Sequence, residues 1–166
     1  MRLKTLITMA LVCGAVSFAS GNSSEEKVEL KNVKVRIIEA EKFYRISEFL
    51  GGGENTGRRV ILRTTPEERG GTYFILRFSK SIKKLPEDLD ITLDFYEAGS
   101  TLLHSYRLPF PEERKGTNKL FLGVTCDTIE KKYPPVAWRL ALEDSNGQVY
   151  TDIKSYLWEI PEDFED

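Results

Sequence analysis

The chain has 166 residues, with 24 Lys and Arg against 26 Asp and Glu, one His and two Cys. That length is typical of a single domain with a core of its own. A charge balance this close to neutral argues against nucleic-acid binding, which needs a clustered excess of basic residues. One His and two Cys are too few for a zinc-finger or iron–sulfur site. We therefore expect no nucleic-acid partner and no cofactor.

Residues 1–19 are typical of a secretory signal peptide. Arg2 and Lys4 precede an uncharged stretch, residues 6–18, and Ser17 and Ala19 supply small side chains at a cleavage site. A retained membrane anchor is the alternative, but the uncharged stretch is shorter than the roughly 20 residues of a bilayer-spanning helix. The sequence predicts export to the periplasm or cell surface, with no membrane-spanning segment after cleavage.

The remaining chain divides into a polar linker, residues 20–26, a single domain, residues 27–158, and an acidic tail, residues 159–166. Five acidic residues gather in that tail: Glu159, Glu162, Asp163, Glu165 and Asp166. The domain itself is nearly neutral. A solvated terminus is the simplest interpretation of the tail.

Cys126 is the one cysteine that follows the predicted leader. An exported chain with one cysteine cannot form an intramolecular disulfide, so its stability has to come from the core. A buried thiol and a disulfide to another chain both remain open for this residue.

Apolar and polar residues alternate along most of the chain, which is the period of a β-strand. Val33, Val35 and Ile37, for example, would share one face while Lys34 and Arg36 face the other way. Strands are expected over residues 30–37, 43–49, 58–64, 72–79, 89–95, 102–108, 119–125, 136–142 and 148–158. Only residues 127–133 favour a helical turn.

Turn-forming residues separate these strands. Asn146-Gly147 is a strong hairpin signal, because both residues tolerate a positive φ, and it would join the strand of Trp138 to the next one. Many short strands and no long helical pattern predict an all-β fold. We expect an immunoglobulin-like β-sandwich of about 8–9 strands, with a small open β-barrel as the alternative.

No motif for catalysis, cofactor or metal binding emerges. Gly52 and Gly57 have the glycine spacing of a phosphate-binding loop, but Arg58-Arg59 and a strand follow where Lys-Ser/Thr and a helix should be. Residues 144–147 superficially resemble a calcium loop, but a hairpin explains them without a metal. His104, the one histidine, has no nucleophile motif beside it. We therefore expect a protein that is not an enzyme.

A modest cluster of arginines in the second and third expected strands would suit an acidic partner. Tyr73 would point outward if Phe74, Leu76 and Phe78 point inward, and an exposed aromatic can anchor a partner. The candidate partner-contact residues are Arg58, Arg59, Arg63, Tyr73 and Arg77.

Residues 43–49 (FYRISEF), 55–64 (NTGRRVILRT) and 135–140 (PVAWRL) resemble small exported immunoglobulin-like proteins that are associated with type IV pilus and secretin systems of Gram-negative envelopes. The resemblance lies in size, leader and strand pattern over residues 27–158, and it carries over no functional residue. It implies a periplasmic or surface component of pilus assembly. The prepilin leader of pilins themselves is absent.

Three functions follow as hypotheses. The first is an exported non-enzymatic protein-interaction module of the cell envelope, on the resemblance a type IV pilus-associated one, which binds its partner by strand addition at an edge. Residues 27–38 are the expected edge strand. The second is a carbohydrate- or matrix-binding domain that uses exposed strand aromatics. The third is a hydrolase on a β-scaffold, for which the sequence offers no catalytic motif.

Overall fold

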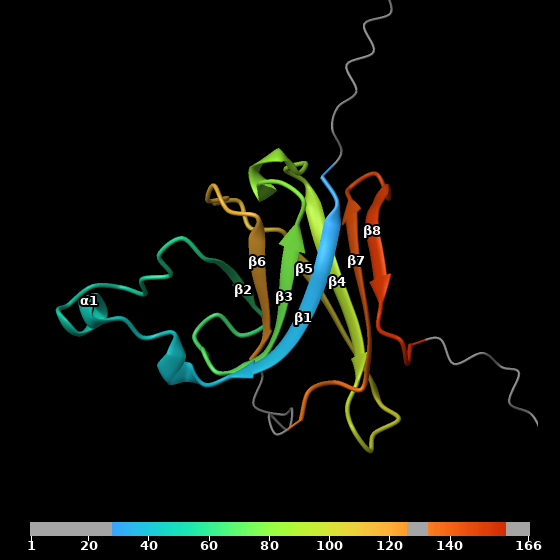
Figure 1. The fold of residues 1–166 in the computed structure, drawn as a ribbon, viewed down its shortest axis with the longest axis horizontal. Helices are drawn as coiled ribbons and strands as arrows, with labels where there is room; N and C mark the ends of the chain where they lie inside the picture. Colours follow the sequence, from blue (N-terminus) through green and yellow to red (C-terminus); the bar gives the residue numbers. More distant parts are fainter. Residues whose placement is uncertain (1–27, 126–132, 159–166) are drawn as a thin grey trace, which may run out of the picture.

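Two four-stranded β-sheets pack face to face and enclose the core (Figure 1). The structure, a computed structural model, describes residues 28–125 and 133–158. The predicted leader, the linker, Cys126, most of the expected helical turn and the acidic tail all lie outside the described residues.

The first sheet, sheet A, has the strand order β1-β3-β6-β2. Its strands are β1 (Leu30–Ile38), β2 (Val60–Arg63), β3 (Gly71–Phe78) and β6 (Lys119–Val124). β2 runs parallel to β6, while the other pairs are antiparallel. The second sheet, sheet B, is antiparallel throughout, in the order β5-β4-β7-β8. Its strands are β4 (Leu89–Tyr96), β5 (Leu103–Pro109), β7 (Ala137–Asp144) and β8 (Val149–Lys154).

This topology confirms the predicted all-β sandwich. If β2 is set aside, β1, β3 and β6 of the first sheet correspond in order to strands A, B and E of an immunoglobulin-like sandwich. The strands β5, β4, β7 and β8 of the second sheet correspond to its strands C′, C, F and G. The sheets stay open and separate, so the barrel alternative does not apply. β1 is an edge strand of sheet A, as expected for residues 27–38.

The core is built from one face of each sheet. Along β4, burial alternates residue by residue, and Phe95 lies in the inner layer with Phe74 of β3. The Trp138 ring of β7 meets Phe74 edge-on, with ring centroids 5.8 Å apart, and so joins the two sheets. Each fully buried side chain of this size contributes roughly 2 kcal/mol to stability. The completely buried apolar side chains that share this layer are Phe74, Leu76, Ile82, Ile91, Leu120, Leu122, Leu140 and Leu142.

The link between β1 and β2 differs from the sequence prediction. Residues 43–49 do not form a strand; the link holds a 3-10 turn, η1 (Ala40–Lys42), and a single helical turn, α1 (Ile46–Phe49). We call residues 39–59 the arm, because they project from the end of the sandwich (Figure 1). The alternating pattern there has no neighbouring strand to pair with. The described helices, of which η2 (Ile82–Lys84) is the third, are all too short to cross a membrane.

The β7–β8 hairpin forms as predicted. Gly147 has a φ of 79°, and its N–H donates to the Asp144 carbonyl at 3.0 Å. β8 ends at Lys154, earlier than the predicted residue 158, and a turn closed by the Trp158 N–H and the Ser155 carbonyl follows it.

Candidate functional site

The outer face of sheet A gathers basic side chains from three strands. Asn32, Arg77 and Lys119 are Cα partners in one row across β1, β3 and β6, and Lys34, Ile75 and Phe121 form the next row. We define the basic face as these six residues together with Arg36 of β1. Strand pairing therefore places positions 34, 77 and 119, which are far apart in the sequence, side by side.

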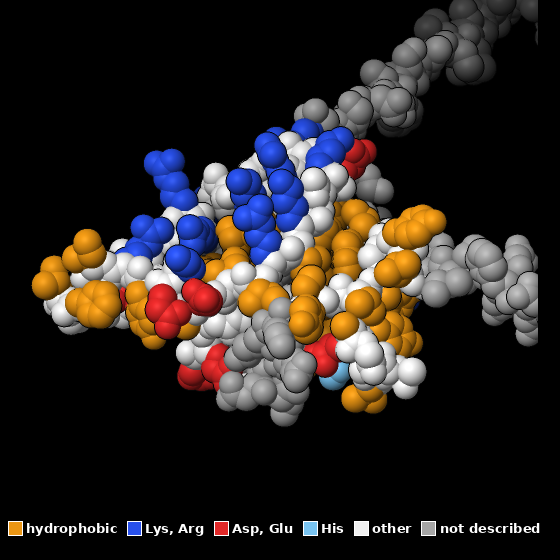
Figure 2. Space-filling model, turned by 60° about the horizontal axis from the view of Figure 1, so that its bottom comes forward, with side chains coloured by type: hydrophobic (Ala, Val, Ile, Leu, Met, Phe, Trp, Pro, Cys, Tyr) orange, Lys and Arg blue, Asp and Glu red, His pale blue; other side chains and the backbone are white. Residues whose placement is uncertain are grey.

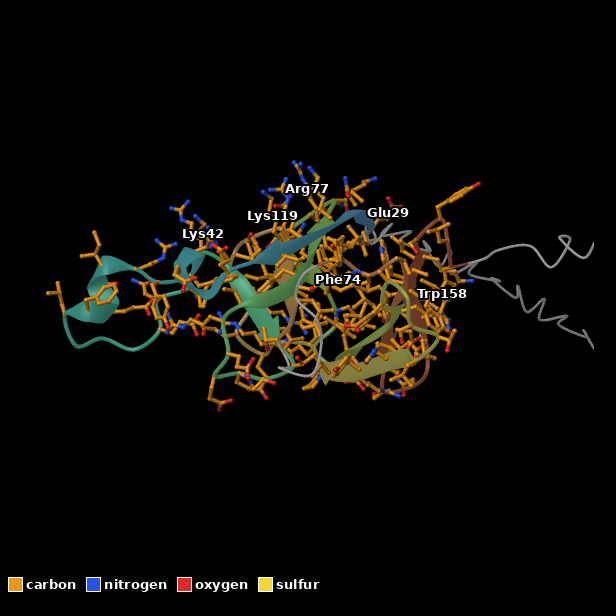
Figure 3. The ribbon with its side chains drawn as sticks, turned by 90° about the horizontal axis from the view of Figure 1, so that it is seen from below. Glu29, Lys42, Phe74, Arg77, Lys119 and Trp158 are labelled. Carbon is orange, nitrogen blue, oxygen red and sulfur yellow. The ribbon has the colours of Figure 1, made fainter. Side chains whose placement is uncertain are left out.

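The basic face is hollowed into a groove of about 230 Å³. The space-filling view shows Lys and Arg side chains clustered over β1, β3 and β6 (Figure 2), and Arg77 and Lys119 lie along the same border as Lys42 (Figure 3). Within the described residues, Lys34, Arg36, Arg77 and Lys119 form no ion pair. No carboxylate lines the groove, so its charge is uncompensated.

The outer face of sheet B provides a comparison inside the same molecule. There Arg107 of β5 bonds to Asp90 of β4, and Arg139 of β7 bonds to Asp152 of β8, each at 2.9 Å. Within the described residues, two strand arginines of sheet B are thus paired with carboxylates, whereas Lys34, Arg36, Arg77 and Lys119 of the basic face are not. The basic face therefore differs from the outer face of sheet B in carrying cations without carboxylate partners among the residues that line it.

Two of the predicted contact residues, Arg77 and Arg59, lie at or beside this surface. Arg77 belongs to the basic face. The Arg59 guanidinium, just before β2, lies 5.5 Å from the centroid of the ring of Phe121, which lines the groove. Arg58 is exposed and lines a separate hollow with Lys115.

Arg63 and Tyr73 are not available to a partner, which corrects the prediction for both. Tyr73 does point away from the core, but it is 0% exposed. Its ring covers Gly123 of β6 and packs against the ring of Phe43 of the arm, with centroids 4.8 Å apart and the planes tilted by 37°. Arg63 is buried beside it. The arm and the loop after β2 cover this end of sheet A, which a pattern of alternating residues cannot reveal.

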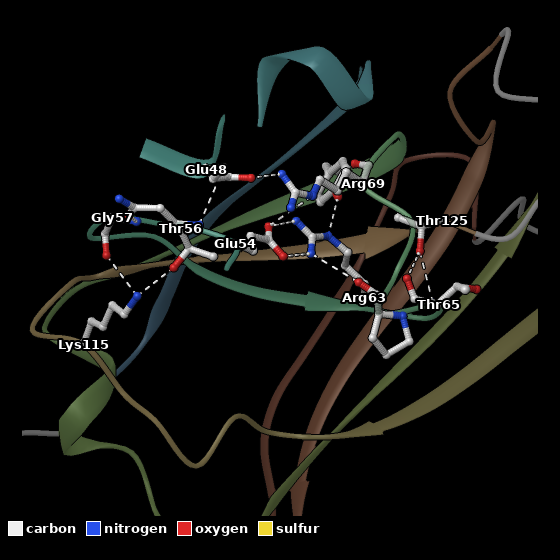
Figure 4. Close-up of polar contacts among 12 residues, drawn as sticks. Glu48, Glu54, Thr56, Gly57, Arg63, Thr65, Arg69, Lys115 and Thr125 are labelled. Carbon is white, nitrogen blue, oxygen red and sulfur yellow. Dashed lines mark hydrogen bonds and ion pairs between the residues drawn. The ribbon is translucent and has the colours of Figure 1, made fainter. Parts of the chain in front are cut away.

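Arg63 and Tyr73 instead form a polar network that fastens the arm (Figure 4). Arg63 donates to Glu54 at 2.8 and 2.6 Å and, through Nε, to the Tyr73 hydroxyl at 3.0 Å. The Tyr73 hydroxyl donates to the Arg69 carbonyl, and the Arg69 guanidinium bonds to Glu48 of α1. These residues hold the arm in place.

The network also shifts proton equilibria. The hydrogen bond from Arg69 is the main reason that the pKa of Glu48 lies below its ordinary value of 4.5. Arg63 lowers the pKa of Glu54 in the same way, and burial opposes the shift in both. Both carboxylates are therefore ionised at neutral pH, and their charge is balanced by the two arginines.

Lys34, Arg36 and Lys119 were not among the partner-contact residues predicted from the sequence. In the sequence, each of them is an ordinary polar residue on the solvent-facing side of a half-buried strand. The available signal was that the polar side of these strands is basic, whereas the polar side of β4 carries Asp90 and Asp94.

The part of the chain that the structure describes holds no metal-binding cluster. No group of three or more His, Cys, Asp or Glu residues there could hold a metal ion. His104 of β5 stacks on Phe95 at 5.0 Å, and its Nε2 lies 4.0 Å from a Glu97 carboxylate oxygen. Cys126 lies outside the described residues. The prediction that the protein is not an enzyme stays a prediction.

Comparison with known proteins gave no match, whether to a protein-family model, a curated protein or a solved structure.

Proposed function

We propose that this protein is an exported, non-enzymatic protein-interaction module of the cell envelope, and that it binds an acidic, extended segment of a partner protein at the basic face. The observation that carries the proposal is the groove over β1, β3 and β6, with its unpaired cations and no carboxylate in its lining. Charge complementarity of this kind gives speed and specificity to an encounter.

The edge position of β1 explains why the partner segment is extended. Within the described residues, β1 pairs with β3 alone, so its outer edge offers backbone groups to an added strand. A strand added there would place alternate side chains beside Lys34 and Arg36, and the others beside Val33 and Val35, which pack against the core. The partner strand should therefore alternate acidic and apolar residues.

The same charges disfavour pairing of β1 with a second copy of itself. Two β1 edges would bring Lys and Arg side chains together, and like charges on neighbouring strands destabilise a sheet. The edge of β1 therefore disfavours pairing with a second β1 strand and favours pairing with an acidic strand.

The association with type IV pili is the finer version of the proposal. It is supported by the resemblance in size, leader and strand pattern, and by the predicted export. Affinity capture from envelope extracts of the source organism tests it. Capture of a pilus or secretin component by the native chain, and its loss with Lys34→Gln/Arg36→Gln, is the expected result.

No observation favours the carbohydrate alternative. It requires exposed aromatics on strands, and among the described strands the aromatic side chains are buried or half-buried.

Calorimetric titration tests the binding proposal directly. The probe is a ten-residue peptide with Asp and Val alternating, and a peptide of the same composition with its Asp residues grouped is the control. We expect Lys34→Gln/Arg36→Gln to weaken binding about tenfold and added salt to weaken it further. Arg107→Gln/Arg139→Gln, the matched neutralisation on sheet B, should leave it unchanged.

Two results would overturn the proposal. One is equal binding by the two double variants, which would mean that the basic face is not the site. The other is tighter binding of a DNA or RNA oligonucleotide than of the peptide, which would replace the protein partner with a nucleic acid.

A further inference from the structure

The tip of the arm exposes an unusual set of apolar side chains. Ile46, Phe49 and Leu50 are 82%, 79% and 83% exposed, and Tyr44 beside them is half exposed. α1, which carries Ile46 and Phe49, lies at the far end of the arm (Figure 1), where the space-filling view shows hydrophobic side chains away from the sandwich (Figure 2). Single exposed apolar residues are common on proteins, but a cluster at the end of a projection marks a contact site.

The tip is held out rather than left to fold back onto the sandwich. Asn55 donates from its backbone to the Glu48 carboxylate at 3.1 Å and from its side chain to the Ser47 hydroxyl at 3.0 Å. At the base of the arm, Lys115 donates to Thr56 and to the Gly57 carbonyl. Together with the hydrogen bond from Arg69 to Glu48, these contacts within the chain hold the tip in its position without any binding partner.

The charges of the arm favour an anionic surface. Its exposed cations are Lys42, Arg45, Arg58 and Arg59. Of its carboxylates, Glu48 and Glu54 are balanced by Arg69 and Arg63, which leaves Glu39 and Glu41 at the end next to β1. From Lys42 onward the uncompensated charges of the arm are therefore all basic, from Arg45 beside the tip to Arg58 and Arg59 at its base.

We propose that the arm docks on an anionic lipid membrane, with Ile46, Phe49 and Leu50 inserted among the headgroups and acyl chains. A membrane of anionic lipids offers an apolar layer directly beneath a negatively charged one, which matches an apolar tip flanked by cations. The tip is convex, so it needs a medium that closes around it. The same surface on a second copy would repel these cations.

This site is independent of the proposed function, because it uses no residue of the basic face. Cosedimentation with vesicles tests it on the chain from residue 20 to 166. Vesicles of phosphatidylcholine alone are compared with vesicles of phosphatidylcholine and phosphatidylglycerol. We expect binding to the mixed vesicles, and a loss of at least about tenfold in Ile46→Ser/Phe49→Ser/Leu50→Ser.

The control removes apolar side chains elsewhere. Leu102 and Leu157 are 64% and 50% exposed and lie outside the arm, so Leu102→Ser/Leu157→Ser should bind vesicles like the native chain. Arg45→Gln/Arg58→Gln should weaken binding several-fold, and only to the mixed vesicles.

Equal vesicle binding by the tip variant and the native chain would overturn the proposal, as would no binding by the native chain. Loss of self-association or of a captured protein in the tip variant, without vesicle binding by the native chain, would assign the tip to that partner instead. The acidic-peptide titration separates the two sites: the tip variant should bind the peptide like the native chain even if the lipid proposal fails.

Discussion

The ring of Tyr73 lies directly over Gly123 on the neighbouring strand, so close that a Cβ at position 123 would fall 2.5 Å from Tyr73 Cε1. This contact lets an outward-pointing tyrosine lie flat against sheet A and reach Arg63 with its hydroxyl. The arm then covers the ring through Phe43. One glycine thus permits the network that positions the arm.

Gly123→Ala should therefore destabilise the protein. The new methyl group would displace the Tyr73 ring, and overpacking of this kind costs about 1–3 kcal/mol in the free energy of unfolding. Urea denaturation followed by circular dichroism measures it. Gly116→Ala is the control, because a Cβ at position 116 would meet nothing within 4 Å. Equal stability of the two variants would contradict the role given to the contact.

Arg63→Met tests whether the polar network stabilises the fold. The change leaves the Glu54 carboxylate, which is partly buried, without its main partner, and we expect a loss of about 2–3 kcal/mol. Arg107→Met removes the exposed pair with Asp90 on sheet B and should cost less than about 1 kcal/mol. If the two variants lose the same amount in urea denaturation, the network has no special role.

The strand pattern predicted the fold because burial alternates wherever a strand has one wet face. The expected strands around Val33, Leu93 and Leu140 formed, and so did the hairpin at Gly147. The pattern failed at residues 43–49, where apolar residues are plentiful but no strand lies beside them. Apolar residues that serve a surface look the same in a sequence as those that serve a core.

The candidate site was predicted only in part, since burial and clustering are set by packing. The burial of Arg63 and Tyr73 depends on the arm, a segment outside both sheets. Lys34 and Lys119 lie on the same surface because β1 and β6 flank β3 in the sheet. Arg77 was found because it belongs to the arginines that the second and third expected strands share, and Lys119 was missed because its strand has no other charge.

The acid side of the stability profile should depend on Glu48 and Glu54. Both have a pKa in the folded protein below the ordinary value of 4.5, so the stability they add is present above that pH and is lost as the pH falls below it. The free energy of unfolding of the native chain should therefore drop as the pH falls below 4.5.

The variant Glu48→Gln/Glu54→Gln should show a shallower drop over the same pH range, because those two carboxylates no longer take up protons. Thermal unfolding at a series of pH values measures the slope. Asp88 and Asp152, whose pKa values are also lowered, keep part of the dependence in the variant. An unchanged slope would mean that the pKa values of the two glutamates are the same in the folded and unfolded states.

Lys119→Glu should make the protein more stable and a poorer binder. Lys119 stands directly opposite Arg77, and like charges at directly opposed positions destabilise a sheet, whereas opposite charges add about 0.2–1 kcal/mol. Arg107 and Arg139 of sheet B have carboxylate partners, so the unpaired cations of the basic face carry a cost that a binding function would explain.

The two readouts have to move in opposite directions. In urea denaturation the midpoint of Lys119→Glu should rise, with Lys119→Gln between it and the native chain. In the peptide titration the affinity should fall in the same order, by about tenfold for the charge reversal. A variant that gains stability and still binds the acidic peptide would remove Lys119 from the site. A variant that loses stability would show that Arg77 and Lys119 do not repel each other. The unpaired cations of the basic face would then not lower the stability of the fold, and this argument for a binding function would fail.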